Sequence, residues 1–248
     1  MSRYVTTDWH GRADIADKVL EYLKEDDELY FLGDAIDRGP DGLYIMEKLL
    51  QDPRVTYLKG NHEDMFVDAI SDYIEGRSGM SMQHWISQGG DTTWAAAVKL
   101  SDASLWRIHS RLRSLPERID LTTEDGKTII LSHAGCDPWV DDEIAKYWGL
   151  KDRYIWDRKH IHSSSIDFKQ EEWKDTYVIH GHTPVITRHF CGDEDVVLPG
   201  YEEVKAVYYA DGHKICLDLY TVGTGRAVLF DLDTFEEIYF TEKGIVKQ

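Results

Sequence analysis

The sequence predicts an α/β protein that begins with a parallel sheet and continues into a second, β-rich part. Between residues 3 and 58, three short apolar strands alternate with two amphipathic helices. A βαβαβ order of this kind requires right-handed crossovers, which place the strands side by side and in parallel. After residue 116 the pattern changes to short strands separated by tight turns, which is typical of antiparallel pairing.

The first predicted strand, 3–6, runs into a loop that carries Asp8 and His10. An Asp-x-His spacing on a loop lets both side chains reach one metal ion. An amphipathic helix follows, with its apolar face formed by Ile15, Val19, Leu20 and Leu23. This part of the chain therefore predicts a strand, a polar loop and a helix.

The second predicted strand, 29–32, ends at the loop 33–39, whose sequence is Gly-Asp-Ala-Ile-Asp-Arg-Gly. Asp34 and Asp37 are three residues apart, so on a turning loop they point in different directions. One can bind a metal while the other orients a neighbouring group. The guanidinium of Arg38 can hold a phosphate through two parallel hydrogen bonds.

The third predicted strand, 55–58, ends at Lys-Gly-Asn-His-Glu, residues 59–63. Because the carboxyl ends of parallel strands meet at one edge of a sheet, we expect the three loops to lie together. The side chains expected to share this crevice are Asp8, His10, Asp34, Asp37, Asn61 and His62.

Residues 64–115 have a helical pattern and no strand signal, so we expect a helical insertion or cap beside the crevice, within a single domain of residues 1–248. The segment 85–93 reads Trp-Ile-Ser-Gln-Gly-Gly-Asp-Thr-Thr. Its two glycines are consistent with a turn between two helices, which is the simplest interpretation.

The C-terminal half predicts a hairpin of strands 118–122 and 128–132, followed directly by His133. A further strand, 177–179, leads to His180 and His182, of which His180 is expected in a supporting or core position. Strands between 204 and 240 are expected to form an antiparallel meander that makes most of the second sheet.

Composition excludes several classes of function. The formal charge of −18 disfavours nucleic-acid binding, which requires a basic surface. The three cysteines are far apart and contain no Cys-x-x-Cys spacing, so neither a disulfide framework nor a thiolate zinc site is expected. Because no apolar run reaches membrane-spanning length and residues 1–3 lead straight into a strand, we expect a soluble cytoplasmic protein without a signal peptide.

The ordered motifs together resemble those of the calcineurin-like metallophosphoesterases. Asp8-x-His10, the 33–39 loop, Gly60–Glu63, His133 and Gly181-His182 span residues 8 to 182. Within that family they are similar to the phosphoprotein phosphatase branch, and the 85–93 segment resembles one found in bacterial Ser/Thr phosphatase-like proteins. The resemblance implies a four-layer α/β/β/α sandwich with two mixed sheets flanked by helices.

The resemblance also implies a site for two divalent metal ions, with Asp34 bridging them. One ion would be held by Asp8, His10 and Asp34, and the other by Asp34, Asn61, His133 and His182. Imidazole, carboxylate and amide ligands suit Mn²⁺, our first choice, as well as Fe or Zn²⁺. Such a pair of ions would generate a bridging hydroxide for in-line attack at phosphorus.

The same resemblance assigns roles around the reacting phosphate. His62, oriented by Asp37, would protonate the leaving group as general acid. Arg38 would clamp the phosphoryl oxygens, and Arg158, with Arg153 in reserve, would provide a second clamp. Two positions depart from the family pattern: Thr7 replaces a glycine before Asp8, and Lys59 stands where a phosphate-binding arginine is common.

The resemblance further implies a phosphatase acting on phosphoserine or phosphothreonine in proteins. One alternative is a hydrolase of dinucleoside polyphosphates such as diadenosine tetraphosphate, for which Trp85, Trp94 and Trp106 could stack a base. Another is a phosphate-binding scaffold without activity. The sequence leaves open the oligomeric state and the choice between a phosphoprotein and a small phosphoester as substrate.

Overall fold

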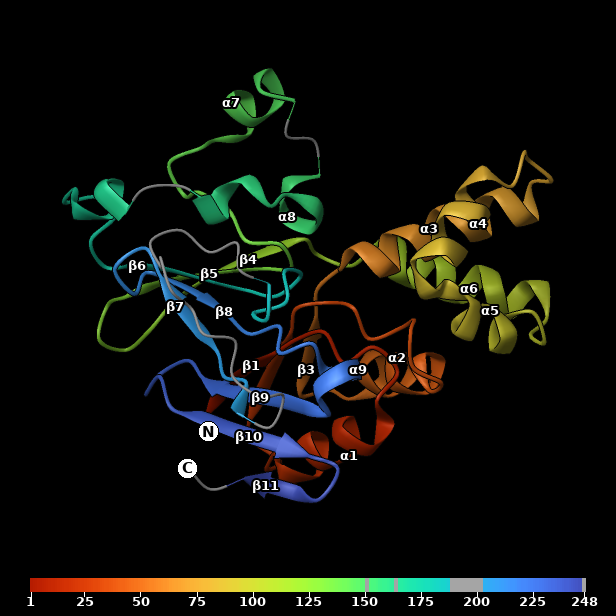
Figure 1. Cartoon of the computed structure of the whole chain (residues 1–248), viewed down its shortest axis with the longest axis horizontal. Helices are drawn as coiled ribbons and strands as arrows, with labels where there is room; N and C mark the ends of the chain where they lie inside the picture. The colour runs from red at the N-terminus through yellow and green to blue at the C-terminus, as the bar shows by residue number, and fades with distance from the viewer. Residues whose placement is uncertain (150–151, 163–164, 188–202, 247–248) are drawn as a thin grey trace.

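The computed structural model describes residues 1–149, 152–162, 165–187 and 203–246. Its frame consists of two mixed sheets that face each other (Figure 1). In the first sheet the strands run in the order β11 (Gly244–Val246), β10 (Glu237–Thr241), β9 (Arg226–Asp231), β1 (Arg3–Thr6), β2 (Glu28–Phe31) and β3 (Val55–Tyr57). In the second the order is β4 (Arg118–Thr122), β5 (Thr128–Ser132), β6 (Thr176–His180), β8 (Lys214–Cys216) and β7 (Val207–Tyr209).

The N-terminal part folds as the sequence predicts. Strand β1 pairs in parallel with β2, and β2 pairs in parallel with β3, with the crossover helices α1 (Ala13–Tyr22) and α2 (Gly42–Gln51) between them. Their apolar side chains alternate between the two faces, as a pleated strand requires. Val5 and Leu32 pack in the core shared with the second sheet, whereas Leu29 and Phe31 pack in the core that includes α1 and α2.

The second sheet differs from the expected C-terminal meander. The hairpin of β4 and β5 is antiparallel as predicted, and β6 joins β5 in parallel. Of the later strands in the described part of the chain, however, only β7 and β8 join this sheet, while β9, β10 and β11 extend the first one. The prediction that one meander makes most of the second sheet is therefore wrong, because the buried strand β9 pairs with β1 instead.

The chain between β3 and β4 contains helices joined by short turns and no strand. It contains α3 (Asn61–Ile74), α4 (Met80–Trp85), the single π-turn Ile86–Gly90, α5 (Asp91–Ala97) and α6 (Asp102–Arg113). These helices form a bundle beside the two sheets (Figure 1). Its apolar residues, including Phe66, Trp85 and Leu112, belong to the same core as α1 and α2.

The remaining helices lie near the second sheet and at the end of β8. They are α7 (Asp142–Tyr147), α8 (Arg153–Trp156) and α9 (Thr221–Thr224), together with the 3₁₀ turns Lys159–His162 and Ser165–Lys169. Helices thus flank both sheets, which is the four-layer arrangement that the family resemblance implies (Figure 1). In the part of the chain that the structure describes, no helix is long and apolar enough to cross a bilayer.

Candidate metal centre and active site

The loops that follow β1, β2, β3, β5 and β6 converge where the two sheets face each other. Main-chain hydrogen bonds join them: the N–H of His10 donates to Asp34 O at 3.0 Å, and the N–H of Gly181 donates to His133 O at 2.8 Å. The ring of His133 reaches across to the other sheet, with Nδ1 3.0 Å from the carbonyl oxygen of Leu32. This common edge is where parallel sheets place binding sites.

The six predicted ligand side chains are brought together and buried at this edge. His10 Nε2 lies 3.6 Å and His133 Nε2 3.4 Å from Asp34 Oδ2. Asn61 Oδ1 lies 2.9 Å from His133 Nε2 and 2.8 Å from His182 Nδ1. We call Asp8, His10, Asp34, Asn61, His133 and His182 the central cluster; each is no more than 6% exposed.

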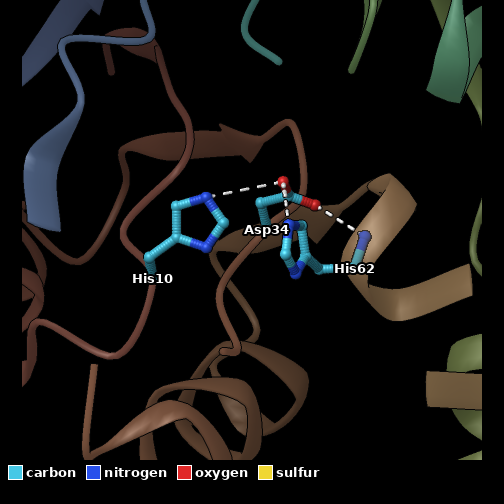
Figure 2. A group of neighbouring side chains, drawn as sticks. All are labelled: His10, Asp34 and His62. Carbon is cyan, nitrogen blue, oxygen red and sulfur yellow. Dashed lines mark hydrogen bonds and ion pairs between the residues drawn. The ribbon is translucent and has the colours of Figure 1, made fainter. Parts of the chain in front are cut away.

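Asp34 lies at the middle of the central cluster. Among the described residues, two groups have potential ligand atoms that all lie within 4.8 Å of one another: His10, Asp34 and His62, and Asp8, Asp34 and His133. Figure 2 shows the first of these groups, with both imidazoles facing the Asp34 carboxylate. Asp34 alone belongs to both groups, and the three imidazoles of these groups all lie within 3.8 Å of its Oδ2.

The electrostatics of the cluster reflect buried negative charge. Burial, followed by the nearby Asp218 carboxylate, raises the pKa of Asp8 well above its usual range. Burial likewise disfavours the imidazolium of His133, yet the Asp34 carboxylate outweighs this effect and raises its pKa to about 9. Asp34 is also buried, but the charges of His133 and His62 hold its pKa well below the usual range.

The residues fit divalent metal ions. Carboxylates without water require compensating positive charge, and the oxygen and imidazole donors of the cluster suit Mn²⁺, Fe or Zn²⁺. His182 Nε2 is buried and has no hydrogen-bond partner among the described residues, which leaves its lone pair available to a cation. The second nitrogens of His10 and His133 bond to the main-chain oxygens of Ile36 and Leu32, as is usual for ligand imidazoles.

Two glycines and one threonine let the carboxylates approach closely. A Cβ on Gly60 would lie 2.2 Å from Asp34 Oδ1, and one on Gly181 would lie 2.0 Å from Asp8 Oδ2. Thr7, which replaces the family's glycine, donates its hydroxyl to Asp8 Oδ2 at 2.6 Å. The substitution therefore adds a hydrogen bond to a predicted ligand.

His62 and Asp37 form a buried pair beside the cluster. His62 Nδ1 lies 2.7 Å from Asp37 Oδ2, and its Nε2 faces Asp34 Oδ2 at 3.8 Å. The two terminal nitrogens of Arg38 lie 2.7 Å from His10 Nε2 and 3.0 Å from His62 Nε2. An imidazole held at one nitrogen by a carboxylate, with its other nitrogen facing the reacting centre, has the geometry of a general acid or base.

The other predicted substrate-binding cations have different surroundings. Arg158 donates to the carbonyl oxygen of His182 at 3.3 Å; burial lowers its pKa, and the carboxylates of Asp218 and Asp34 partly offset this.

Arg153 donates its hydrogen bonds elsewhere, to Val140 O, Asp142 and the Tyr154 hydroxyl. Lys59 is 8% exposed and its ammonium lies 3.1 Å from Glu117 Oε1. Of these three, Arg158 alone is placed by its charge interactions near the central cluster.

Sequence reasoning gave no role to two buried acids at the site. Glu63 accepts hydrogen bonds from the N–H groups of Asp34, Ala35 and Gly60 at 2.7 to 3.0 Å, and so ties two ligand loops together. Asp218 follows β8, and burial raises its pKa to about 6. The rule that found the other loops, an acid after an apolar parallel strand, could have found Asp218, but the apolar pattern of residues 215–219 predicts a strand that continues past this position.

Buried carboxylates and imidazoles next to the guanidinium groups of Arg38 and Arg158 define a metal-dependent hydrolase of phosphate esters. The chain belongs to the calcineurin-like phosphoesterase family, whose model matches residues 1–214. It is therefore a metal-dependent phosphatase, and a scaffold without activity is disfavoured.

Relatives of two kinds resemble this chain. An asymmetrical bis(5'-nucleosyl)-tetraphosphatase of Anoxybacillus flavithermus is 27% identical over 68% of this chain and 71% of its own length. Serine/threonine-protein phosphatase 2 of Escherichia coli is 32% identical over 53% of this chain and 57% of its own length, so that match spans little more than half of the relative. Sequence similarity thus leaves two substrate classes open.

A solved structure described as a putative diadenosine tetraphosphatase has the same fold. It superposes with a TM-score of 0.59 at 15% identity, covering 96% of this chain and 92% of the other. A metallophosphoesterase from Sphaerobacter thermophilus gives a TM-score of 0.51 at 17% identity, covering all of this chain and 88% of the other. At these identities the likeness establishes the fold alone.

Proposed function

We propose that this protein is a cytoplasmic phosphatase for phosphoserine and phosphothreonine in proteins, with Mn²⁺ as its metal. The pairing of His62 with Asp37, 2.7 Å apart beside the central cluster, carries the proposal. A serine or threonine alkoxide is a poor leaving group and needs a proton as it departs, which a positioned imidazolium supplies. A nucleotide leaving from a polyphosphate is already a stable anion and gains less from such a proton.

The residues would divide the work as follows. Asp8, His10 and Asp34 would hold one ion, and Asp34, Asn61, His133 and His182 the other. When bound, two such ions activate a water molecule and neutralise charge at the phosphoryl group. Arg38 and Arg158 would clamp the phosphoryl oxygens, for which Arg38 would move its donors from the imidazoles to the substrate. His62 would then release a proton from Nε2 to the leaving oxygen.

The rival function is hydrolysis of dinucleoside polyphosphates, which is the activity named for one of the relatives. A stacking site for a base would support it, but Trp85 is fully buried. Trp94 is partly buried against Tyr73, and Trp106 is 40% exposed. The net charge of −18 also opposes long-range attraction of a polyphosphate.

The test is one assay of initial rates with two substrate classes. The protein is treated with a chelator, restored with Mn²⁺, and given phosphoserine and phosphothreonine peptides or diadenosine tetraphosphate. We expect the peptides to be hydrolysed faster and the rate to be lost on chelation. A faster rate with the dinucleotide would assign the rival function.

Metal analysis addresses the remaining alternative of an inactive scaffold. We expect close to two metal ions per chain after reconstitution with Mn²⁺, together with hydrolysis of at least one phosphoester. Substantially less than two ions, with no turnover of any substrate, would favour the scaffold.

A further inference from the structure

The 85–93 segment contacts the loop after β2, where Asp37 and Arg38 lie. The indole Nε1–H of Trp85 donates to Asp37 Oδ2 at 2.7 Å. The Thr93 hydroxyl oxygen accepts the N–H of Asp37 at 2.9 Å, and the carbonyl oxygen of Gly89 accepts the N–H of Arg38 at 2.9 Å. Both residues of the loop are therefore held by hydrogen bonds from the helical segment.

Trp85 is fixed in place by its own packing. Its side chain is fully buried, and its ring centroid lies 5.3 Å from that of Phe66 and 6.5 Å from that of Trp94. A Cβ on Gly90 would lie 2.4 Å from the indole, so glycine is needed there for the ring to fit. The packing of these neighbours thus fixes the indole N–H in the direction of Asp37.

Asp37 depends on this donor for its orientation. Oδ2 receives both the Trp85 indole and His62 Nδ1, each at 2.7 Å, whereas Oδ1 is buried and has no hydrogen-bond partner among the described residues. Asp37 also has a left-handed backbone conformation, with φ of 71°, which residues other than glycine rarely adopt. Without the indole, the carboxylate can rotate and His62 loses a fixed partner.

We propose that Trp85 is a positioning residue for the general acid: through Asp37 it aims His62 at the leaving oxygen. This inference rests on the proposed function and extends it from the loops of the sheet to the helical segment. It gives the 85–93 segment a positioning role at the active site in addition to that of a turn between helices.

The experiment compares two substrates that differ in their need for a proton. A phosphoserine peptide loses an alkoxide, whereas p-nitrophenyl phosphate loses a phenolate that is stable without protonation. For Trp85→Phe we expect kcat on the peptide to fall roughly tenfold, part of what a general acid contributes, with little change on p-nitrophenyl phosphate. KM should stay unchanged for both, since Trp85 does not contact the phosphate.

Trp94→Phe is the matched control. Trp94 lies in the same aromatic cluster but donates no hydrogen bond to Asp37. We expect this variant to treat both substrates alike. A loss in Trp85→Phe that is equal for the two substrates would mean a structural role and would overturn the proposal.

A second route avoids the risk that Trp85→Phe does not fold. Thr93→Val removes the acceptor of the Asp37 N–H, and Thr93→Ser restores it. We expect a selective loss on the peptide in the first variant and recovery in the second. Thermal unfolding and metal content identify variants that fail to fold, and the absence of selective loss in every folded variant would contradict the proposal.

A double-variant cycle shows whether Trp85 acts through His62. If it does, Trp85→Phe combined with His62→Asn should be no slower on the peptide than His62→Asn alone, because the two changes remove one function. Losses that multiply would overturn the proposal. A wild-type protein that hydrolyses neither substrate would instead remove the proposed function, so the two failures can be told apart.

Discussion

The two edges of the first sheet are built in opposite ways. At the carboxyl ends of β1 and β2, five residues have φ between 42° and 71°: Asp8, His10, Asp34, Asp37 and Arg38. At the amino ends, buried Asp27 accepts the N–H groups of Ser2 at 2.9 Å and Lys24 at 3.0 Å, and Arg54 pairs with Asp52 at 2.6 Å. The carboxyl edge therefore combines strained backbone with like charges, whereas at the amino edge the polar groups are paired by hydrogen bonds and an ion pair.

This contrast separates function from stability within one sheet. Left-handed backbone at residues other than glycine and carboxylates packed side by side both cost folding free energy, and they persist where chemistry needs them. The amino edge has no such residues to hold and can be optimised for stability. Substitutions at the carboxyl edge should therefore remove activity while the fold survives, and those at the amino edge should do the reverse.

The largest effect is expected for Asp34→Asn. Asp34 is shared by both groups of potential ligands, so an amide in its place weakens both metal sites at once. We expect activity to fall to the level of a blank and bound metal to fall below one ion per chain, measured by elemental analysis. Circular dichroism should still show the folded protein; a variant that keeps two ions would contradict the bridging role.

His62→Asn should separate catalysis from metal binding. The asparagine removes the proton donor but leaves the central cluster intact, so both ions should remain while turnover of a phosphoserine peptide falls roughly a hundredfold or more. Stopped-flow or steady-state kinetics measures the turnover, and elemental analysis of the same sample measures the bound metal. An unchanged rate would remove His62 from the mechanism.

Arg158→Ala tests the part of the site contributed by the second sheet. Because Arg158 lies beside His182 and is predicted to bind phosphate, its loss should raise KM roughly tenfold, the scale of a hydrogen bond to a charged group. Lys59→Ala is the comparison, since the ammonium of Lys59 is paired with Glu117. A larger rise in KM for Lys59→Ala would transfer the clamp to that residue.

Local sequence patterns were sufficient for the carboxyl edge of the sheet. A polar loop after an apolar strand is a short-range signal, so the ligand loops around Asp8, Asp34 and Asn61 could be predicted from residues only a few positions apart. The α/β class followed from the same alternation of strands and helices, whereas the four-layer arrangement was implied by the family resemblance. The particular roles of these residues stay predictions until the variants above are measured.

Long-range pairing could not be predicted in the same way. Strand β9 is apolar on both faces, and nothing local indicates that it pairs with β1 rather than β8. The hydrogen bond from Trp85 to Asp37 joins residues 48 positions apart, so the local pattern of the 85–93 segment predicted a turn and not this contact. Asp218 was not predicted as a site residue because β8 ends at Cys216, whereas the apolar pattern of the sequence continues to residue 219.

The smallest effect is expected at the amino edge, for Asp52→Asn. The carboxylate of Asp52 receives Arg54 Nε at 3.0 Å and Nη2 at 2.6 Å, and the same guanidinium donates to the carbonyl oxygens of Leu23 and Leu20. Side-chain hydrogen bonds from Arg54 hold the pKa of Asp52 below its usual value. The pair thus ties the end of α1 to the turn before β3.

The sign of the pH dependence follows from that lowered pKa. A carboxyl group that is more acidic in the folded than in the unfolded protein contributes stability above its unfolded pKa, about 3.9, and loses it as the pH falls through the folded value. Asp52→Asn should therefore reduce the free energy of unfolding by about 1 kcal/mol near pH 7, with the difference shrinking below about pH 4. Urea unfolding of both proteins across this range measures it, and peptide hydrolysis at pH 7 should be unchanged. A pH-independent difference, or a loss of activity without a loss of stability, would mean that the two edges of the sheet do not divide function from stability.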